Sequence, residues 1–199
     1  LARLTAQVGA VVLNANGDAG RFARFGLPVV ADSVGGFVGP LAGVLAGMDW
    51  AAAQGYDAVL SVAGDTPFFP DDLAARLGAA LGSAPIAMAT GPGGGRQARH
   101  PTFALWRVGL RAELRDALES AHRQAAWSYL QHLRGDFERV VEITAINRHA
   151  GIFDQLLVAG VERGDGNFGH KDPKRTLRIL RGQRQTPSSP RTPPTQNRY

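Results

Sequence analysis

The chain has 199 residues, which is enough for one domain with a hydrophobic core of its own. It contains no cysteine, and this excludes disulfides, thiolate zinc sites and a cysteine nucleophile. The net charge of +5 arises in residues 170–199, which contain eight Lys and Arg and one Asp. Residues 1–169 contain 14 basic and 16 acidic groups, so they lack the excess of cations that a nucleic-acid-binding surface needs.

Apolar segments along the chain alternate between short strand-like and longer helix-like patterns. The expected strands cover residues 8–14, 28–31, 56–63, 85–90, 102–106 and 139–143. The expected helices cover residues 19–25, 40–54, 69–81, 108–121 and 124–133. Strands that alternate with helices are typical of βαβ units, so the pattern predicts an α/β fold with a mainly parallel sheet.

Polar side chains stand where three of the expected strands end. Asn14 ends the first strand, Asp32 follows the second, and Asp65 follows the third. Ligands of open α/β sheets bind outside the carboxyl ends of the strands. A carboxylate there can hold Mg²⁺, which prefers oxygen ligands and accompanies substrate phosphates. Residues of these types also cap loops at strand exits, so the pattern alone leaves both interpretations open.

Two glycine-containing loops could approach an anionic ligand. Gly39–Gly43 leads into a helix with proline in its first turn, and such a helix N-terminus presents free N–H groups. Gly91–Gly95 lacks the Lys and Ser/Thr of a phosphate-binding loop and indicates a mobile connection between two strands. Arg96, Arg99 and His100 after it could hold an anionic substrate; the alternative is that they are ordinary solvated loop residues.

Five short motifs follow one another in a characteristic order. They are Asn14-Ala-Asn16, Val30-Ala-Asp32-Ser33, Gly39-Pro-Leu-Ala-Gly43, Gly64-Asp-Thr-Pro67 and His100-Pro-Thr102. Together they resemble the molybdenum cofactor guanylyltransferase family, the MobA-like nucleotidyltransferases of molybdopterin-guanine dinucleotide synthesis. The resemblance covers residues 8–140, and the third and fourth motifs favour the guanylyl branch of these enzymes.

The resemblance implies an α/β fold with a Rossmann-like, mainly parallel sheet and flanking helices, of the nucleotide-diphospho-sugar transferase type. It implies transfer of GMP from GTP to molybdopterin-bound molybdenum cofactor, with release of pyrophosphate and with Mg²⁺ as the metal cofactor. Asp65 would be the catalytic residue that holds the metal, and Asn14, Asp32 and Asp65 would contact the nucleotide. Further partners expected from the resemblance are cofactor-synthesis proteins or molybdoenzyme chaperones.

The chain departs from the family pattern at both ends. It begins after the family's glycine-rich loop and first strand, and its two lysines, Lys171 and Lys174, lie outside the motifs. We therefore expect an N-truncated nucleotidyltransferase domain at residues 1–163, with two unpaired edges where the first strand would lie. Each missing phosphate-binding group removes part of the stabilisation of the reaction, so the activity of this chain stays open. Residues 164–199 are basic and rich in Pro and Arg, which predicts a disordered tail, native or read from a shifted frame.

Other functions remain open at this point. The domain could be a cytidylyl- or sugar-nucleotide transferase of the same fold, which the preferred nucleotide would reveal. It could also be a non-catalytic fragment or a binding module whose basic tail meets RNA or acidic partners. No apolar run reaches the roughly 18 residues of a membrane span, and residues 1–7 lack the apolar core of a signal peptide, so no membrane partner and a cytoplasmic location are expected.

Overall fold

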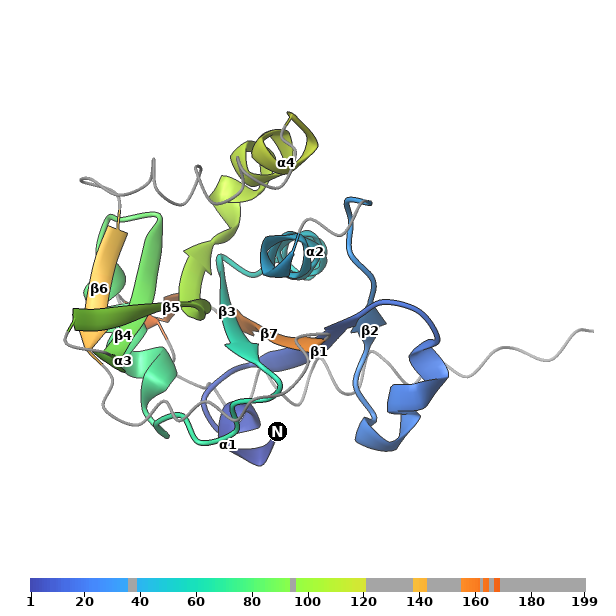
Figure 1. Ribbon diagram of the computed structural model, residues 1–199, viewed down its shortest axis with the longest axis horizontal. Coiled ribbons are helices and arrows are strands. Elements are labelled where there is room, and N and C mark those ends of the chain that lie inside the picture. The colour runs from blue at the N-terminus through green and yellow to red at the C-terminus, as the bar shows by residue number, and fades with distance from the viewer. Residues whose placement is uncertain are drawn as a thin grey trace, which may run out of the picture.

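Seven strands form one sheet in the computed structural model, which describes residues 1–35, 39–93, 96–120, 138–142, 155–161, 163–164 and 167–168 (Figure 1). The order across the sheet is β2-β1-β7-β3-β5-β4-β6. The strands are β1 Ala10–Ala15, β2 Val29–Val30, β3 Ala58–Ala63, β4 Ile86–Gly93, β5 Arg96–Arg107, β6 Glu138–Glu142 and β7 Gln155–Val161. A separate small hairpin joins β8 Arg163–Gly164 to β9 Asn167–Phe168. The helix predicted at 124–133 lies outside the described residues, and so does the disordered tail predicted at 164–199, except for Gly164 and Asn167–Phe168, which belong to this hairpin.

Five strands of this sheet run in one direction, while β5 and β7 run against them. β1 pairs in parallel with β2, and β4 pairs in parallel with β6. β7 is antiparallel to both β1 and β3, and β5 is antiparallel to both β3 and β4. Since β1 and β3 both oppose β7, and β3 and β4 both oppose β5, the other five strands share one direction. The predicted α/β class with a mainly parallel strand direction is confirmed.

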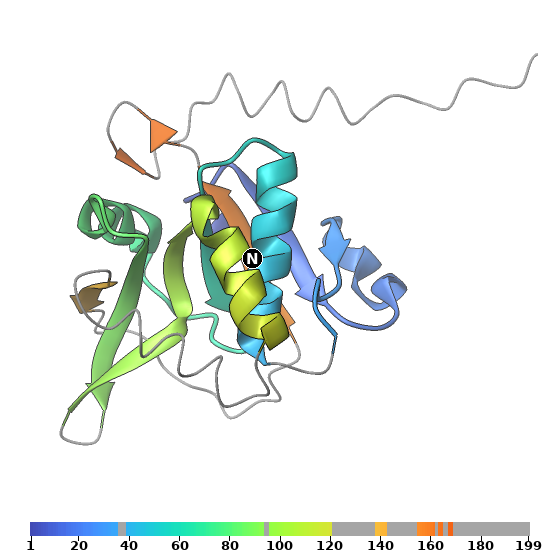
Figure 2. The same ribbon diagram turned by 90° about the horizontal axis from the view of Figure 1, so that it is seen from above.

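Helices cover both faces of the sheet. α2 Pro40–Ala53 and α4 Arg111–Ser120 lie side by side over one face, and α1 Ala2–Thr5 and α3 Leu73–Leu81 lie on the other (Figures 1 and 2). Two 3-10 helices, η1 Ala19–Phe25 and η2 Val108–Leu110, follow β1 and β5. Within the described residues, no helix has the length and apolar character needed to cross a membrane.

The central strand β3 is buried along its whole length because both of its faces are covered. Val59 packs toward Leu45 of α2 and Leu114 of α4, whereas the next residue, Leu60, packs toward Leu77 of α3. Successive side chains of a strand point to opposite faces. A strand covered on both sides therefore needs apolar or small residues at every position, which is the pattern that predicted it.

A strand from the C-terminal half of the chain lies inside the sheet, between β1 and β3. β7 forms six residue pairs with β1 and six with β3, so it separates these two strands along their length. The sequence-based expectation of two unpaired edges at this place is wrong, because β7 pairs with both edges. Buried backbone N–H and C=O groups require partners, and the apolar segment Leu156–Ala159 supplies them.

β7 also passes very close to the ring of Tyr56. A Cβ placed on Gly160 would lie 2.4 Å from Cδ2 and 2.6 Å from Cε2 of this ring. Both Gly160 and Tyr56 are buried. Only a residue without a side chain fits at this position without displacing the ring. The glycine at position 160 therefore allows β7 to pass next to Tyr56 between β1 and β3.

The glycine-containing segment between β4 and β5 differs from its prediction as a loop. The two strands form an antiparallel ladder that reaches Gly93 opposite Arg96, with an irregularity of register between Met88 and Ala89. The hairpin extends beyond the body of the sheet (Figure 2). The segment was predicted as a loop because Gly91–Gly95 has low strand propensity, whereas pairing across a tight hairpin supplies its backbone partners.

The other described elements lie close to their predicted ranges. The strand predicted at 28–31 is reduced to Val29–Val30, and the helix predicted at 69–81 begins only at Leu73. α2 begins at Pro40 as predicted, and its N-cap, Gly39, has a φ of 86°, a conformation that glycine adopts without strain. The entry into α2 therefore depends on this glycine.

Candidate functional site

The carboxyl ends of β1 and β3 lie at the same edge of the sheet. Asn14 of β1 and Ala63 of β3 both pair with Leu156 of β7, so the two strands end level with each other. Adjacent strands are about 4.8 Å apart, which puts β1 and β3 about 10 Å from each other across β7. Asp65 follows Ala63 by two residues, and it therefore emerges at the same edge as Asn14.

Asp32 is bound to the end of β1 by three hydrogen bonds. Asn14 Nδ2 donates to Asp32 Oδ1 at 3.0 Å, and Asn16 Nδ2 donates to Asp32 Oδ2 at 2.8 Å. The backbone N–H of Asp32 donates to Asn16 Oδ1 at 2.9 Å. Asn14 Nδ2 also donates to the carbonyl oxygen of Val30 at 3.2 Å, which secures the end of β2. The structure thus brings the two predicted residues Asn14 and Asp32 into direct contact.

Asn16 belongs to this cluster although it was predicted only as part of a motif. Asn14 and Asn16 are two residues apart near the end of a strand, so their side chains leave the same face. Asn14 is buried and Asn16 is exposed. The spacing Asn-Ala-Asn is the signal that could have identified Asn16 as a second support of the Asp32 carboxylate.

Asp65 lies on the exit of β3, half-buried, with its neighbour Thr66 buried beneath it. The Thr66 hydroxyl donates to Asp65 Oδ1 at 3.0 Å, and the Thr66 N–H donates to the carbonyl oxygen of Ala63 at 3.3 Å. These contacts fix the direction of the carboxylate. Because the strand ends here, the carboxylate stands at the rim of the sheet rather than inside the core.

Asp65 would offer a magnesium ion one carboxylate ligand. In the described part of the chain, no group of three or more His, Asp or Glu side chains could hold a metal. Mg²⁺ is commonly bound through one or two carboxylates, with water and substrate phosphates as the remaining ligands. A single carboxylate at an open strand end therefore fits a metal that arrives with a nucleotide.

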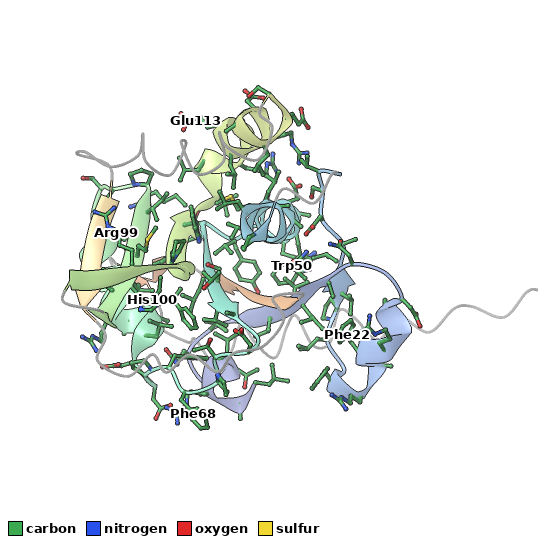
Figure 3. All side chains as sticks on the ribbon, viewed as in Figure 1. Phe22, Trp50, Phe68, Arg99, His100 and Glu113 are labelled. Atoms are coloured by element: carbon green, nitrogen blue, oxygen red, sulfur yellow. The ribbon has the colours of Figure 1, made fainter. Side chains whose placement is uncertain are left out.

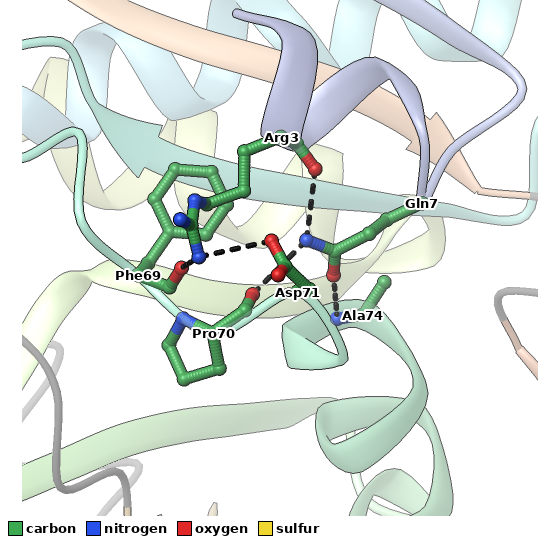
Figure 4. A network of polar contacts seen from close by, with 6 residues as sticks. All are labelled: Arg3, Gln7, Phe69, Pro70, Asp71 and Ala74. Atoms are coloured by element: carbon green, nitrogen blue, oxygen red, sulfur yellow. Dashed lines mark hydrogen bonds and ion pairs between the residues drawn. The ribbon is translucent and has the colours of Figure 1, made fainter.

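The loop after Asp65 is held in place by hydrogen bonds from the N-terminal segment of the chain. Gln7 accepts a hydrogen bond from the N–H of Ala74 at Oε1 (2.9 Å), and its Nε2 donates to the carbonyl oxygens of Pro70 and Arg3 (3.0 Å each; Figure 4). Arg3 donates to the carbonyl oxygen of Phe69 and pairs with Asp71, both at 2.9 Å. This network holds residues 69–74 against α1.

Gln7 also replaces the local cap of α3. The N-cap residue, Asp72, makes no side-chain capping bond, and the N–H of Ala74 in the first turn bonds to Gln7 instead. Gln7 is buried at 8% exposure and uses both its donor and its acceptor. Sequence reasoning did not single out Gln7, since its partners Pro70 and Ala74 are more than sixty residues away along the chain.

His100 and Arg99 lie on β5, beyond the segment that pairs with β3. His100 is buried opposite Ala89 of β4, and its ring meets the edge of Phe103 with 6.4 Å between centroids. Arg99 is exposed (Figure 3). The backbone of Arg96 lies at the hairpin turn, opposite Gly93. Anion binding by these three residues stays a prediction.

A second polar cluster ties the segment after Asp32 to the helices above the sheet. Asp49 of α2 accepts a hydrogen bond from the Ser33 hydroxyl at 2.6 Å and from Arg115 of α4, also at 2.6 Å, both on Oδ2. Arg111 lies 3.7 Å from Asp49 Oδ1. The hydrogen bond and the charge of Asp49 raise the pKa of Arg115 above its usual value, so this guanidinium stays protonated.

Comparison with known proteins identifies the family of this chain. A family model described as a MobA-like NTP transferase domain matches residues 1–137. This range includes β1, β3 and β5 and all the polar residues of the strand ends described above.

Curated relatives carry a consistent name. A molybdenum cofactor guanylyltransferase of Mesorhizobium japonicum is 45% identical over 144 residues, which cover 70% of this chain and 68% of that protein. Proteins of the same name from Nitrobacter hamburgensis and a Bradyrhizobium species are 54% and 51% identical over 122 residues, covering 59% and 60% of this chain. This chain spans only 56% and 57% of the length of those two relatives.

Proposed function

Because the chain belongs to the MobA-like NTP transferase family, we propose that it binds GTP with Mg²⁺ at the carboxyl edge of its sheet and transfers GMP to molybdopterin-bound molybdenum cofactor. Pyrophosphate would be the second product. The proposal is supported by the family match over residues 1–137 and by relatives that are named molybdenum cofactor guanylyltransferases. The single observation that carries it is that β1 and β3 end level across β7, with Asp32 bound to Asn14 at the end of β1 and Asp65 two residues after the end of β3.

In this proposal Asp65 holds the metal. Its carboxylate lies at the rim, with one oxygen oriented by the Thr66 hydroxyl. Bound Mg²⁺ would neutralise charge that develops on the phosphates during nucleotidyl transfer. Asp65 contributes by fixing the place where the metal-bound phosphates lie, and Thr66 contributes by fixing Asp65.

Asn14 and Asp32 serve nucleotide binding in the same proposal. Each oxygen of the Asp32 carboxylate already accepts one side-chain amide and retains a lone pair for a donor on the nucleotide. The two asparagines hold the carboxylate in one orientation before the ligand arrives. Preorganisation of this kind lowers the ordering cost of binding.

Calorimetric titration of the chain with GTP and Mg²⁺ tests the proposal, with CTP as the control nucleotide. We expect binding of GTP that strengthens with Mg²⁺ and exceeds binding of CTP. A preference for CTP or for a sugar nucleotide would move the chain to another branch of the same fold. Folded protein that binds no nucleotide would refute the proposed function and favour a non-catalytic role.

A further inference from the structure

The segment that carries Asp32 is held from two sides, and only one of them belongs to the strand-end cluster. From β1, Asn14 and Asn16 hold the carboxylate and the backbone N–H of Asp32. From α2, Asp49 accepts the hydroxyl of Ser33, the next residue in the chain. Asp32 therefore lies between two anchors on different elements.

We propose that Ser33 and Asp49 form a positioning pair that keeps the Asp32 carboxylate in place for the nucleotide, an inference that rests on the proposed role of Asp32. Neither side chain needs to touch the ligand for this role. The pair acts on the segment 31–35, which runs from β2 toward α2 across the edge of the sheet.

The chemistry of the contact favours a specific anchor over a chance surface contact. The distance of 2.6 Å from Ser33 Oγ to Asp49 Oδ2 lies in the short range of hydrogen bonds from hydroxyls to carboxylates. The same oxygen also accepts from Arg115, and Arg111 approaches the other oxygen, so the charge of Asp49 is balanced by α4.

Exposure explains why the segment needs such an anchor. Ser33 and the flanking Ala31 and Gly35 are exposed, and Val34 is only partly buried against the core beneath α2. An exposed segment with one partial apolar contact gains little order from burial. The Ser33–Asp49 bond supplies a fixed point one residue from the carboxylate.

The test compares the variant Ser33→Ala with the wild-type chain. Calorimetry measures the Kd for GTP with Mg²⁺, and amide hydrogen exchange measures the protection of the Asp32 N–H. Loss of the hydroxyl should weaken GTP binding by about three- to tenfold and speed exchange at Asp32, with the Tm unchanged. Ser33→Thr keeps the hydroxyl and should restore both values.

Two further variants separate positioning from general effects. Ser120→Ala removes a serine hydroxyl that bonds the carbonyl oxygen of Asp116 at the end of α4, and it should leave GTP binding unchanged. In an Asp32→Asn background, Ser33→Ala should add no further loss, because the pair acts through Asp32.

The outcomes are distinguishable from those of the proposed function. If wild-type chain binds no GTP, the proposed function is refuted, and exchange at the Asp32 N–H still decides the positioning role. Unchanged exchange in Ser33→Ala would overturn the inference. So would an equal loss of GTP affinity in the Asp32→Asn background, since the hydroxyl would then act on the nucleotide by another route.

Discussion

Replacing Gly160 by alanine tests whether β7 really lies between β1 and β3. Gly160 lies one residue before the end of β7, and the added Cβ would lie 2.4, 2.6 and 2.7 Å from three ring atoms of Tyr56. Carbon atoms in contact are normally about 3.5–4.0 Å apart, so the ring or the strand must move by about 1 Å. Tyr56 is buried at 5% exposure beside the core, and β7 is paired on both sides, so neither can move freely.

The expected loss of stability follows from this overlap. Overpacking a close-packed core costs about 1–3 kcal/mol, and for a domain of this size about 1 kcal/mol lowers the Tm by about 2–4 °C. Gly160→Ala should therefore lower the Tm by about 2–12 °C. Thermal unfolding followed by circular dichroism measures the change, and urea unfolding gives the free energy of unfolding independently.

Gly9→Ala is the matched control because it faces the same ring. A Cβ at Gly9 would lie 3.6 Å from Cε1 and 3.7 Å from the hydroxyl oxygen of Tyr56, which is ordinary contact. We expect this variant to keep the wild-type Tm within about 2 °C. If Gly160→Ala is as stable as Gly9→Ala, then β7 does not pass next to Tyr56, and the placement of β7 between β1 and β3 is wrong.

Three further variants test the site and its supports. Asp65→Asn keeps the shape of the side chain and should abolish the dependence of GTP affinity on Mg²⁺ while the Tm stays constant. Titration with GTP in the presence and absence of Mg²⁺ measures this dependence, and an undiminished dependence would contradict the metal role of Asp65. Gln7→Leu removes the cap on Ala74 together with two donated hydrogen bonds, and it should cost about 2–4 kcal/mol in urea unfolding, whereas a loss below about 0.5 kcal/mol would show that the network is dispensable. Trp106→Phe leaves the fully buried Ser61 hydroxyl without its 3.0 Å donor and should cost about 1–3 kcal/mol, measured in the same way; a neutral result would mean that this bond adds no net stability.

The strands and helices near the site could be predicted from local pattern. The all-apolar segment of β3, the proline at the start of α2 and the polar residues at three strand ends each have a local physical cause. Because the carboxyl ends of strands that share a direction meet at one edge, the grouping of Asn14, Asp32 and Asp65 at that edge followed from the same pattern.

Contacts between distant segments could not be predicted in this way. Gln7 caps α3 across sixty-seven positions of the chain, and Asp49 meets Arg115 across sixty-six. Neither residue belongs to a motif, and an isolated Gln or Asp has no local sign of a distant partner. The extended β4–β5 hairpin was missed for a related reason, since cross-strand pairing outweighed the low strand propensity of its glycines.

By itself, the sequence determined the α/β class, the family and the edge of the sheet at which polar groups collect, because these depend on periodicity and on residue types at strand ends. Only the tertiary structure decided which segment fills the space between β1 and β3. That segment is β7, which runs antiparallel to both strands. The physical reason is that a buried strand edge needs backbone partners from any apolar segment that can reach it. Local sequence does not encode that choice, and the fit of Gly160 beneath Tyr56 becomes visible only once the strand is in place.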